Sequence, residues 1–399
     1  MKTETPTSLI HRSLSGELLF LLAGLAALGA LATNIILPAF PNIGITLGVS
    51  SMALSATLSS FFVTFALGQL FVGPLSDRFG RKWLVLGGLI TFMIGSAICA
   101  LATTLPQLIG GRIIQALGAC ATAVLSRAIA RDLFDGEKLA RTLSLIMVAM
   151  AAAPGFSPLL GSAFTYLLGW RGIFIFVSAL AIILAIHYST RLGETLHADK
   201  RSTLSLPEIL RNYARLLLDR RFIAPALYVS LIIGALYAFF SMAPAILMTG
   251  FGFSSLGLGL FFAATVLVVF AGGLLAPRLA RRWGPIYVAG TGIVIALAGS
   301  ASLLIGQGEF VFFSASLTVF LLGMSLVNPL GTALALHPFA KQAGSASALL
   351  GFLQMSGAAL AVSIGGTLEL PPYRSLGIIL TASLATSLLI FFLSLPRQR

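Results

Sequence analysis

Arg112 is the residue best placed to do chemistry, because it interrupts a long apolar segment. A charged side chain inside a membrane-spanning helix is costly, so it usually serves an ion, a proton or a substrate. At about 1.5 Å of helix rise per residue, Arg112 lies roughly 7 Å below the nearer membrane surface. Asn34 lies at a similar depth and ends a stripe of small residues, Ala23, Ala27 and Ala30. Its amide can form hydrogen bonds but cannot titrate.

Proton transfer would need a carboxylate, yet none of the 12 Asp and Glu residues lies at the centre of a predicted helix. Glu17 and Asp132, both near a membrane surface, are the candidate proton carriers. No cluster of His, Cys and carboxylates predicts a metal site, and the two cysteines favour packing. No Ser, His and Asp arrangement is visible, so the sequence predicts no enzyme.

The elements that position these residues must lie in lipid. The 399 residues are 58% hydrophobic and 9% charged, with a mean hydropathy of +1.00, whereas soluble proteins carry about 25% charged residues. Apolar runs long enough to span a bilayer recur. We therefore predict an all-α integral membrane protein with twelve spanning helices, near residues 17–40, 51–74, 83–103, 107–131, 140–168, 172–192, 222–248, 255–278, 284–305, 309–335, 342–367 and 374–395.

The basic residues set the predicted orientation. With the N terminus inside, all Lys and Arg except Arg112, Arg171 and Arg374 fall on the cytoplasmic side, as the positive-inside rule requires. The net charge of +13 lies in short breaks between apolar runs. It does not form the basic, aromatic face of a nucleic-acid-binding protein, so no nucleic-acid partner is predicted.

The longest polar stretch, residues 193–221, divides the chain into two halves of six helices. We predict an N-terminal bundle at 1–192, a cytoplasmic linker at 193–221 and a C-terminal bundle at 222–399. Residues 204–218 would form either a basic amphipathic helix on the membrane surface or a solvated linker. Residues 77–80 align with 281–284, a weak repeat that is typical of transporters built from two related halves.

Four stretches carry a resemblance to a known family. They are Thr33–Phe40, the Gly-Pro-Leu-Ser-Asp-Arg-Phe-Gly-Arg-Lys segment at 73–82, residues 111–119 followed by Arg131-Asp132, and residues 154–161. Over essentially its whole length the chain resembles drug:proton antiporters of the major facilitator superfamily. It is most similar in pattern to the branch of bicyclomycin, chloramphenicol and florfenicol exporters.

The resemblance implies roles for two motifs. In the 73–82 loop, Asp77 beside Arg78 and Arg81 would close a cytoplasmic latch between the halves, while Gly73 and Gly80 would supply turn freedom and close approach. In the fifth helix, Pro154, Pro158 and Gly161 would form a pliable segment that rocks during transport, or would simply pack tightly. Ser157 replaces the glycine that usually precedes this second proline.

The resemblance also implies a central cavity for the substrate. The residues expected in it with Asn34 and Arg112 are Gln115, Tyr237, Phe240, Asn328 and Gln354, with Gln69, Phe239 and Phe261 as softer candidates. Aromatic walls with a few amides suit planar, partly apolar solutes. Packing or lipid contact is the alternative role for each aromatic residue.

Related exporters usually carry Asp where this chain has Asn34, which leaves three hypotheses open. In the first, the change to Asn34 disables coupling. In the second, a peripheral acid such as Glu17 or Asp132 carries the proton. In the third, an anionic substrate supplies the counter-ion of Arg112, which predicts a preference for carboxylated or phosphorylated solutes.

These observations predict a monomeric, multi-pass protein of the bacterial inner membrane with both termini in the cytoplasm. It would export small amphiphilic compounds, such as phenicols or bicyclomycin, in exchange for protons, by alternating access. The proton gradient would supply the energy without a cofactor. The alternative is export or proton symport of a metabolite such as a nucleoside or siderophore.

Overall fold

A computed structural model describes residues 15–50, 52–197, 199, 201, 206–306 and 308–395. Within these residues the chain is helical and contains no strand. The elements are α1 (Gly16–Asn34), η1 (Leu37–Ala39), α2 (Phe40–Leu47), α3 (Ser55–Phe79), α4 (Arg81–Leu101), α5 (Leu105–Leu133), α6 (Gly136–Leu168), α7 (Trp170–Arg191), α8 (Leu206–Leu218), α9 (Arg220–Ala243), η3 (Pro244–Gly250), α10 (Ser255–Trp283), α11 (Pro285–Ile305), α12 (Phe310–Leu336), η4 (His337–Gln342), α13 (Ala343–Thr367) and α14 (Pro372–Ser394).

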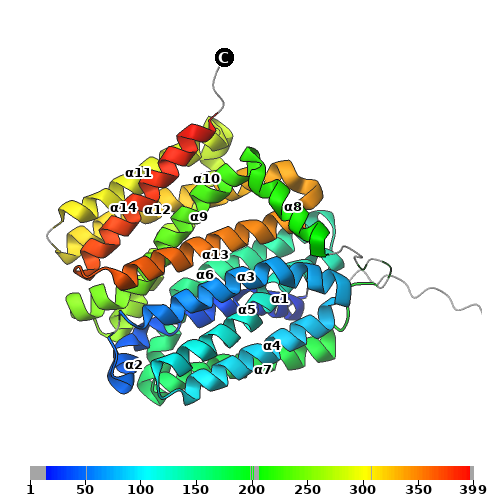
Figure 1. The fold of residues 1–399 in the computed structure, drawn as a ribbon, viewed down its shortest axis with the longest axis horizontal. Coiled ribbons are helices and arrows are strands. Elements are labelled where there is room, and N and C mark those ends of the chain that lie inside the picture. The colour runs from blue at the N-terminus through cyan, green and yellow to red at the C-terminus, as the bar shows by residue number, and fades with distance from the viewer. Residues whose placement is uncertain are drawn as a thin grey trace, which may run out of the picture.

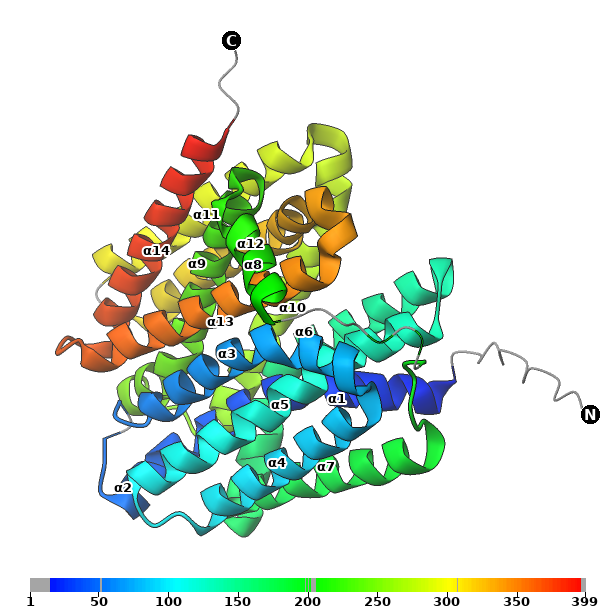
Figure 2. The same ribbon diagram turned by 45° about the vertical axis from the view of Figure 1, so that its right-hand side comes forward.

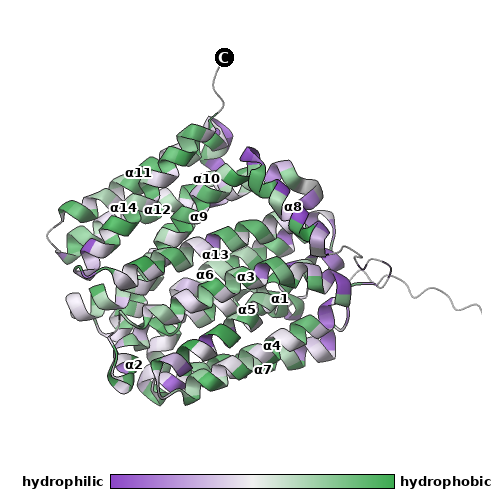
Figure 3. Ribbon diagram, viewed as in Figure 1, coloured by the Kyte–Doolittle hydropathy of each residue, from purple (hydrophilic) through white to green (hydrophobic). Residues whose placement is uncertain are grey.

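Twelve helical segments of the described chain are long and apolar enough to cross a membrane, which confirms the predicted fold class. Helices α1–α7 gather in one bundle and α9–α14 in a second (Figure 1). The helices are apolar along most of their length (Figure 3). Large apolar side chains such as Trp83, Ile94, Leu267 and Leu274 remain exposed on the outside, as a lipid-facing surface requires.

Small residues let neighbouring helices pack closely, because apolar side chains gain nothing from leaving lipid. A Cβ at Gly95 or Gly111 would meet the backbone of the partner helix where α4 crosses α5. The second bundle repeats this arrangement where α11 crosses α12, at Gly299 and Gly323. These two helix pairs also share the most extensive contacts in the fold.

The two bundles meet at one end of the molecule and diverge at the other (Figure 2). We call the diverging end, where α3 meets α4 and α5 meets α6, the basic end, because Arg81, Lys82, Arg131 and Lys138 lie there. At the opposite end the bundles touch: the Ser162 hydroxyl of α6 donates to the Ser255 carbonyl of α10 at 2.7 Å.

The structure corrects the predicted loop at 73–82. Helix α3 continues to Phe79, so Gly73, Asp77 and Arg78 are helical and only Gly80, with φ of 93°, makes the turn. The expectation that Gly73 gives turn freedom or close approach is wrong, since a Cβ there would meet open space. One residue with positive φ is enough to end one helix and start the next.

Two other segments differ from expectation. The predicted first helix ends at Asn34 and continues as η1 and α2, because Pro38 and Pro41 cannot donate helical hydrogen bonds. Residues 206–218 form α8, whose Tyr213 and Leu216 are buried against the ends of α3, α9 and α13. This helix therefore covers protein at the basic end and does not simply lie in the lipid surface.

Candidate functional site

Arg112 is completely buried in α5, seven residues after the helix begins. It therefore lies about 10 Å from the end of the molecule opposite the basic end. Its Nη1 donates to the carbonyl of Ala32 on α1 at 3.0 Å and to Oε1 of Gln115 at 2.5 Å. The guanidinium lies 4.4 Å from the ring centroid of Phe61 on α3. Three helices therefore hold this charge by carbonyl, amide and aromatic contacts.

Two of the hydrogen-bonding groups of Arg112 remain unused. Its Nε and Nη2 are buried without a hydrogen-bond partner, and no carboxylate of the described chain pairs with it. A buried guanidinium with free N–H groups is costly unless an anion or a polar group can reach it. This geometry favours an electronegative group from outside the protein as the missing partner.

Gln115 and Ser96, together with Arg112, form a buried polar cluster that we call the Arg112 cluster. The Gln115 amide donates to the Ser96 hydroxyl of α4 at 2.7 Å, and both side chains are fully buried. The carbonyl oxygen of Gln115 therefore faces Arg112 while its amide is fixed from behind. Ser96 was not predicted, because nothing in its local sequence separates it from other serines in apolar helices.

Asn34 does not contact Arg112 through a hydrogen bond. Its side-chain amide donates to the carbonyl of Ala30 at 2.8 Å and to the Thr33 hydroxyl at 3.2 Å, both on its own helix. The side chain is buried and lies two residues beyond Ala32, so the two groups share a depth. Position 34 thus lies at the depth of the Arg112 cluster but takes no part in its hydrogen bonds.

An aromatic row connects Arg112 to the second bundle. Phe61 contacts Phe62 at 6.3 Å between ring centroids, and Phe62 contacts Tyr237 of α9 at 4.5 Å. Tyr237 in turn contacts Phe240, at 5.8 Å. Tyr237 and Phe240 therefore belong to one aromatic row with two α3 residues that the prediction missed. Their predicted contact with substrate stays a prediction.

The remaining predicted cavity residues lie apart from this row. Gln354 is partly exposed and lies seven residues after Ser347, so both occupy one face of α13. Asn328 is partly exposed on α12, three residues from Gly331, which packs on Val229 of α9. No hydrogen bond joins either amide to another described residue, and their predicted contact with substrate stays a prediction.

A polar cluster at the basic end contains the predicted motif residues. Arg81 donates to Asp77 at 2.5 Å and to Asp132 at 3.0 Å. It also donates to the Ser76 hydroxyl at 2.5 Å. All four residues belong to the first bundle, and no ion pair within the described residues joins the bundles. The latch between the halves is expected where the basic end is closed, whereas the bundles diverge at this end here (Figure 2), so the latch stays a prediction.

Arg78 takes no part in the cluster. It is exposed, and its guanidinium lies 5.4 Å from the Phe79 ring.

The two candidate proton carriers have different surroundings. Glu17 is exposed in the first turn of α1, whereas Asp132 accepts hydrogen bonds from Arg81 and, at 3.1 Å, from Thr195. Neither carboxylate lies near Arg112.

Glu194 is a structural residue that the prediction missed. Its carboxylate accepts the backbone N–H groups of Arg81 and Lys82 at the start of α4, and those of Thr195 and Leu196. It ties the segment after α7 to the positive end of the α4 helix dipole. Only the folded chain brings Glu194 to residues more than 100 positions away, so no local signal identified it.

These N–H groups shift the titration of Glu194. Partial burial alone would raise its pKa, but the four backbone hydrogen bonds favour the ionised carboxylate and hold the pKa below the ordinary value of 4.5. A depressed folded-state pKa stabilises the protein above the ordinary value. That stabilisation is lost as pH falls through the folded-state pKa.

Glu194→Gln should therefore lower the thermal stability of the purified protein at neutral pH, and the deficit should shrink as pH falls from 4.5 through the lower folded-state pKa. Melting curves at several pH values measure the difference. The control Glu137→Gln changes an exposed acid in the first turn of α6 and should leave the pH profile unchanged. A difference in melting temperature that stays constant from pH 7 to the lowest pH measured would contradict this role of the Glu194 charge.

Helix α6 packs very closely on the end of α1, near the end of the molecule opposite the basic end. A Cβ on Gly161 would collide with the Ile35 carbonyl at the end of α1. Pro154 and Pro158 lie inside α6 without ending it, since the helix runs from Gly136 to Leu168. Gly155 faces Val266 of α10 in the other bundle. The predicted motif thus lies where α6 contacts both α1 and the second bundle.

Comparisons with known proteins agree with this architecture. The sequence model of the Major Facilitator Superfamily matches residues 22–362. The chain is 32% identical to the uncharacterised MFS-type transporter YdgK of Bacillus subtilis, over 85% of each chain. It is 31% identical to a chloramphenicol resistance protein of Pseudomonas aeruginosa, over 87% of this chain and 80% of that one.

The fold resembles solved structures at low sequence identity. A mutant of the nucleoside transporter NupG superposes with a TM-score of 0.75 over 95% of this chain and 99% of that one, at 16% identity. This likeness concerns the fold alone.

Proposed function

Because the chain belongs to the major facilitator superfamily, we propose that it exports small amphiphilic compounds from the bacterial cytoplasm in exchange for protons. The observation that carries the proposal is the buried Arg112 beside an aromatic row, with two nitrogens, Nε and Nη2, that have no hydrogen-bond partner among the described residues. Such a site suits a planar solute with an electronegative group. Phenicols have this chemistry, and the similarity to a chloramphenicol resistance protein supports that class.

The positive-inside rule supports placing the basic end in the cytoplasm. The structure then corresponds to a state that is open to the cytoplasm and closed at the periplasmic side. Arg112 lies near the closed end and is covered by Phe61. Rocking of the bundles about the α6–α10 and α3–α13 contacts would close the basic end and open the Arg112 region. Substrate would therefore meet Arg112 as the transporter turns outward.

We propose a carboxylate as the proton carrier, and the described acids lie at helix ends or in connections. Of the two candidates, Asp132 lies in a network that connects α3, α4 and α5, whereas Glu17 is exposed. We assign the proton to Asp132 on this ground. Protonation would weaken its bond to Arg81 and loosen the cluster when the bundles move.

Position 34 tests which partner Arg112 needs. If a solute supplies the missing group, Asn34→Asp should place a competing carboxylate near Arg112 and lower protection against phenicols. A loss of about 1.4 kcal/mol in binding would reduce affinity about tenfold. The measurement is a susceptibility panel in an efflux-deficient bacterium, with phenicols, bicyclomycin, fluoroquinolones and lipophilic cations.

The control Asn42→Asp makes the same chemical change on an exposed residue of α2 and should leave every drug unaffected. Stronger protection by Asn34→Asp against the whole panel would contradict the proposed partner. It would show instead that position 34 is the site of a missing coupling acid. Absence of protection by both the original chain and the Asp variant would contradict drug export.

A further inference from the structure

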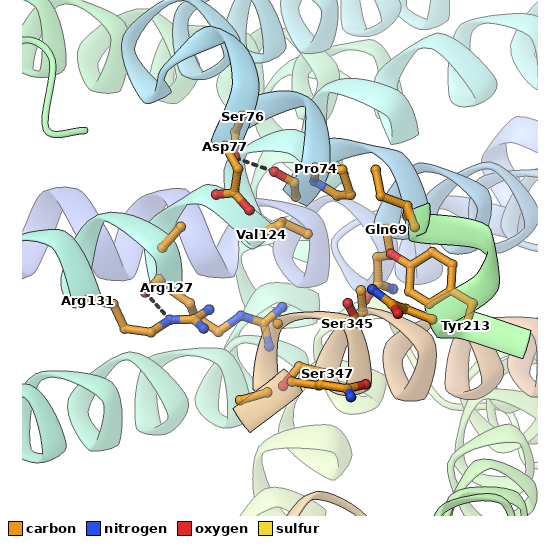
Figure 4. A pocket seen from close by; sticks show the side chains of 18 of the residues that line it. Gln69, Pro74, Ser76, Asp77, Val124, Arg127, Arg131, Tyr213, Ser345 and Ser347 are labelled. Atoms are coloured by element: carbon orange, nitrogen blue, oxygen red, sulfur yellow. Dashed lines mark hydrogen bonds between the residues drawn. The ribbon is translucent and has the colours of Figure 1, made fainter. Parts of the chain in front are cut away.

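A polar pocket at the basic end lies apart from the Arg112 site, although the proposed proton carrier Asp132 lines one side of it. It has a volume of about 450 Å³ and is enclosed by α3, α5, α8 and the first turns of α13. Figure 4 shows Arg127 and Arg131 of α5 extending toward Ser345 and Ser347 of α13. The pocket therefore lies between the two bundles, and Arg127 is about four helical turns along α5 from Arg112.

The charges that line the pocket do not balance. Asp77 and Asp132 both accept hydrogen bonds from Arg81, so each carboxylate already has a cationic partner. Arg131 donates only to the backbone carbonyl of Arg127, at 3.3 Å. The guanidinium of Arg127 is half-buried and forms no hydrogen bond or ion pair with another described residue. Two guanidinium groups thus face one cavity, and neither is paired with a carboxylate of the described residues.

The second wall of the pocket is the N-terminus of a long helix. Ala343, Gly344 and Ser345 are the first three residues of the 25-residue α13, and all three line the pocket. η4 leads directly into this helix, and no described side chain caps it. The dipole of so long a helix makes its N-terminal end attractive to anions.

Neutral donors complete the lining. The hydroxyls of Ser345 and Ser347 and the amide of Asn212 face the pocket, and none of them is bonded to another described side chain or carbonyl. Tyr213, by contrast, donates its hydroxyl to the Leu70 carbonyl at 2.9 Å and fixes α8 against α3. The pocket thus offers guanidinium, hydroxyl, amide and backbone N–H donors from both bundles.

We propose that this pocket binds a phosphate-type oxyanion, as inorganic phosphate or as the phosphate of an anionic lipid. Arg127 and Arg131 contact the oxygens from the first bundle, and the start of α13 contacts them from the second. The bound ion bridges the bundles while the basic end is open and must leave before that end closes. Phosphate therefore holds the transporter in this state, whichever solute the protein exports.

The test is thermal unfolding of the purified full-length protein with increasing phosphate, using chloride at equal ionic strength as the reference. One arm uses neutral detergent with inorganic phosphate, and the other uses nanodiscs with or without phosphatidylglycerol. Arg127→Gln removes the charge at the centre of the site. Arg282→Gln removes an exposed charge of α10 outside the pocket and serves as the control.

We expect a saturable stabilisation whose midpoint concentration rises at least about tenfold in Arg127→Gln and is unchanged in Arg282→Gln. Stabilisation by inorganic phosphate identifies a soluble anion, whereas an Arg127-dependent effect of phosphatidylglycerol alone identifies a lipid headgroup. Arg127→Lys keeps the charge without the planar fork and should bind with intermediate affinity. Equal responses of the original chain and Arg127→Gln in both arms would overturn the proposal.

Discussion

Arg112→Met should abolish drug protection and leave the protein folded. The substitution removes Nε and Nη2, the two nitrogens without a partner among the described residues, which we assign to the substrate. Two hydrogen bonds to a charged group contribute about 1.5–3 kcal/mol each, so their loss should lower transport by roughly 100-fold or more. Drug uptake into proteoliposomes and melting temperature, measured on the same preparation, separate the two effects.

Stability should change little, because the lost bonds to Ala32 and Gln115 are offset by removal of a buried charge that has no counter-ion among the described residues. Arg171→Met is a matched control. Arg171 also donates to a backbone carbonyl, that of Ala102 at 3.0 Å, and lies 4.2 Å from the Trp170 ring. It is partly exposed outside the bundle interior and should be dispensable. Full transport by Arg112→Met would contradict the assignment.

Gly161→Ala should reduce both stability and transport. The new methyl group would collide with the Ile35 backbone carbonyl, which cannot rotate away as a side chain could. Overpacking of this kind costs about 1–3 kcal/mol and would force α6 away from α1. Because α6 also contacts α10 of the second bundle, the displacement should disturb the closed end. Melting temperature and drug uptake report the two losses.

Gly87→Ala provides the comparison for this change. Gly87 lies on an exposed face of α4, and a Cβ there would meet no atom within 4 Å. Alanine improves helix propensity by up to about 1 kcal/mol, so this variant should be as stable as the original or slightly more. Equal stability of the Gly161→Ala and Gly87→Ala variants would show that the α1–α6 approach is not constrained.

The fold was largely predictable, because a long apolar run in the local sequence is enough to indicate a spanning helix. The ends of the helices were harder to predict. Helix α3 continues past Gly73 to Phe79 although it contains Pro74, since a membrane helix tolerates proline where neighbours cover the backbone. The interruption after Asn34 arose from Pro38 and Pro41, whose effect depends on how the end of α1 packs.

The candidate site was predictable only in part. A charge in an apolar helix singled out Arg112, and Gln115, which the resemblance placed in the same cavity, accepts a hydrogen bond from it. Other contacts depend on which helices become neighbours in the folded chain. These are the contacts of Phe61 and Ser96, the cap that Glu194 forms on α4, and the ion pair between Asp132 and Arg81. The latch between the halves stays a prediction, because it would form only when the basic end closes.

The most direct test of the proposed function is chloramphenicol uptake into proteoliposomes that contain the purified chain, with an acidic lumen and a more alkaline exterior. Drug should accumulate above its external concentration as protons leave, and a protonophore should release it. Proteoliposomes with Arg112→Met should show neither effect. Simple equilibration of the drug, unchanged by the proton gradient or by Arg112→Met, would contradict proton-coupled export through this site.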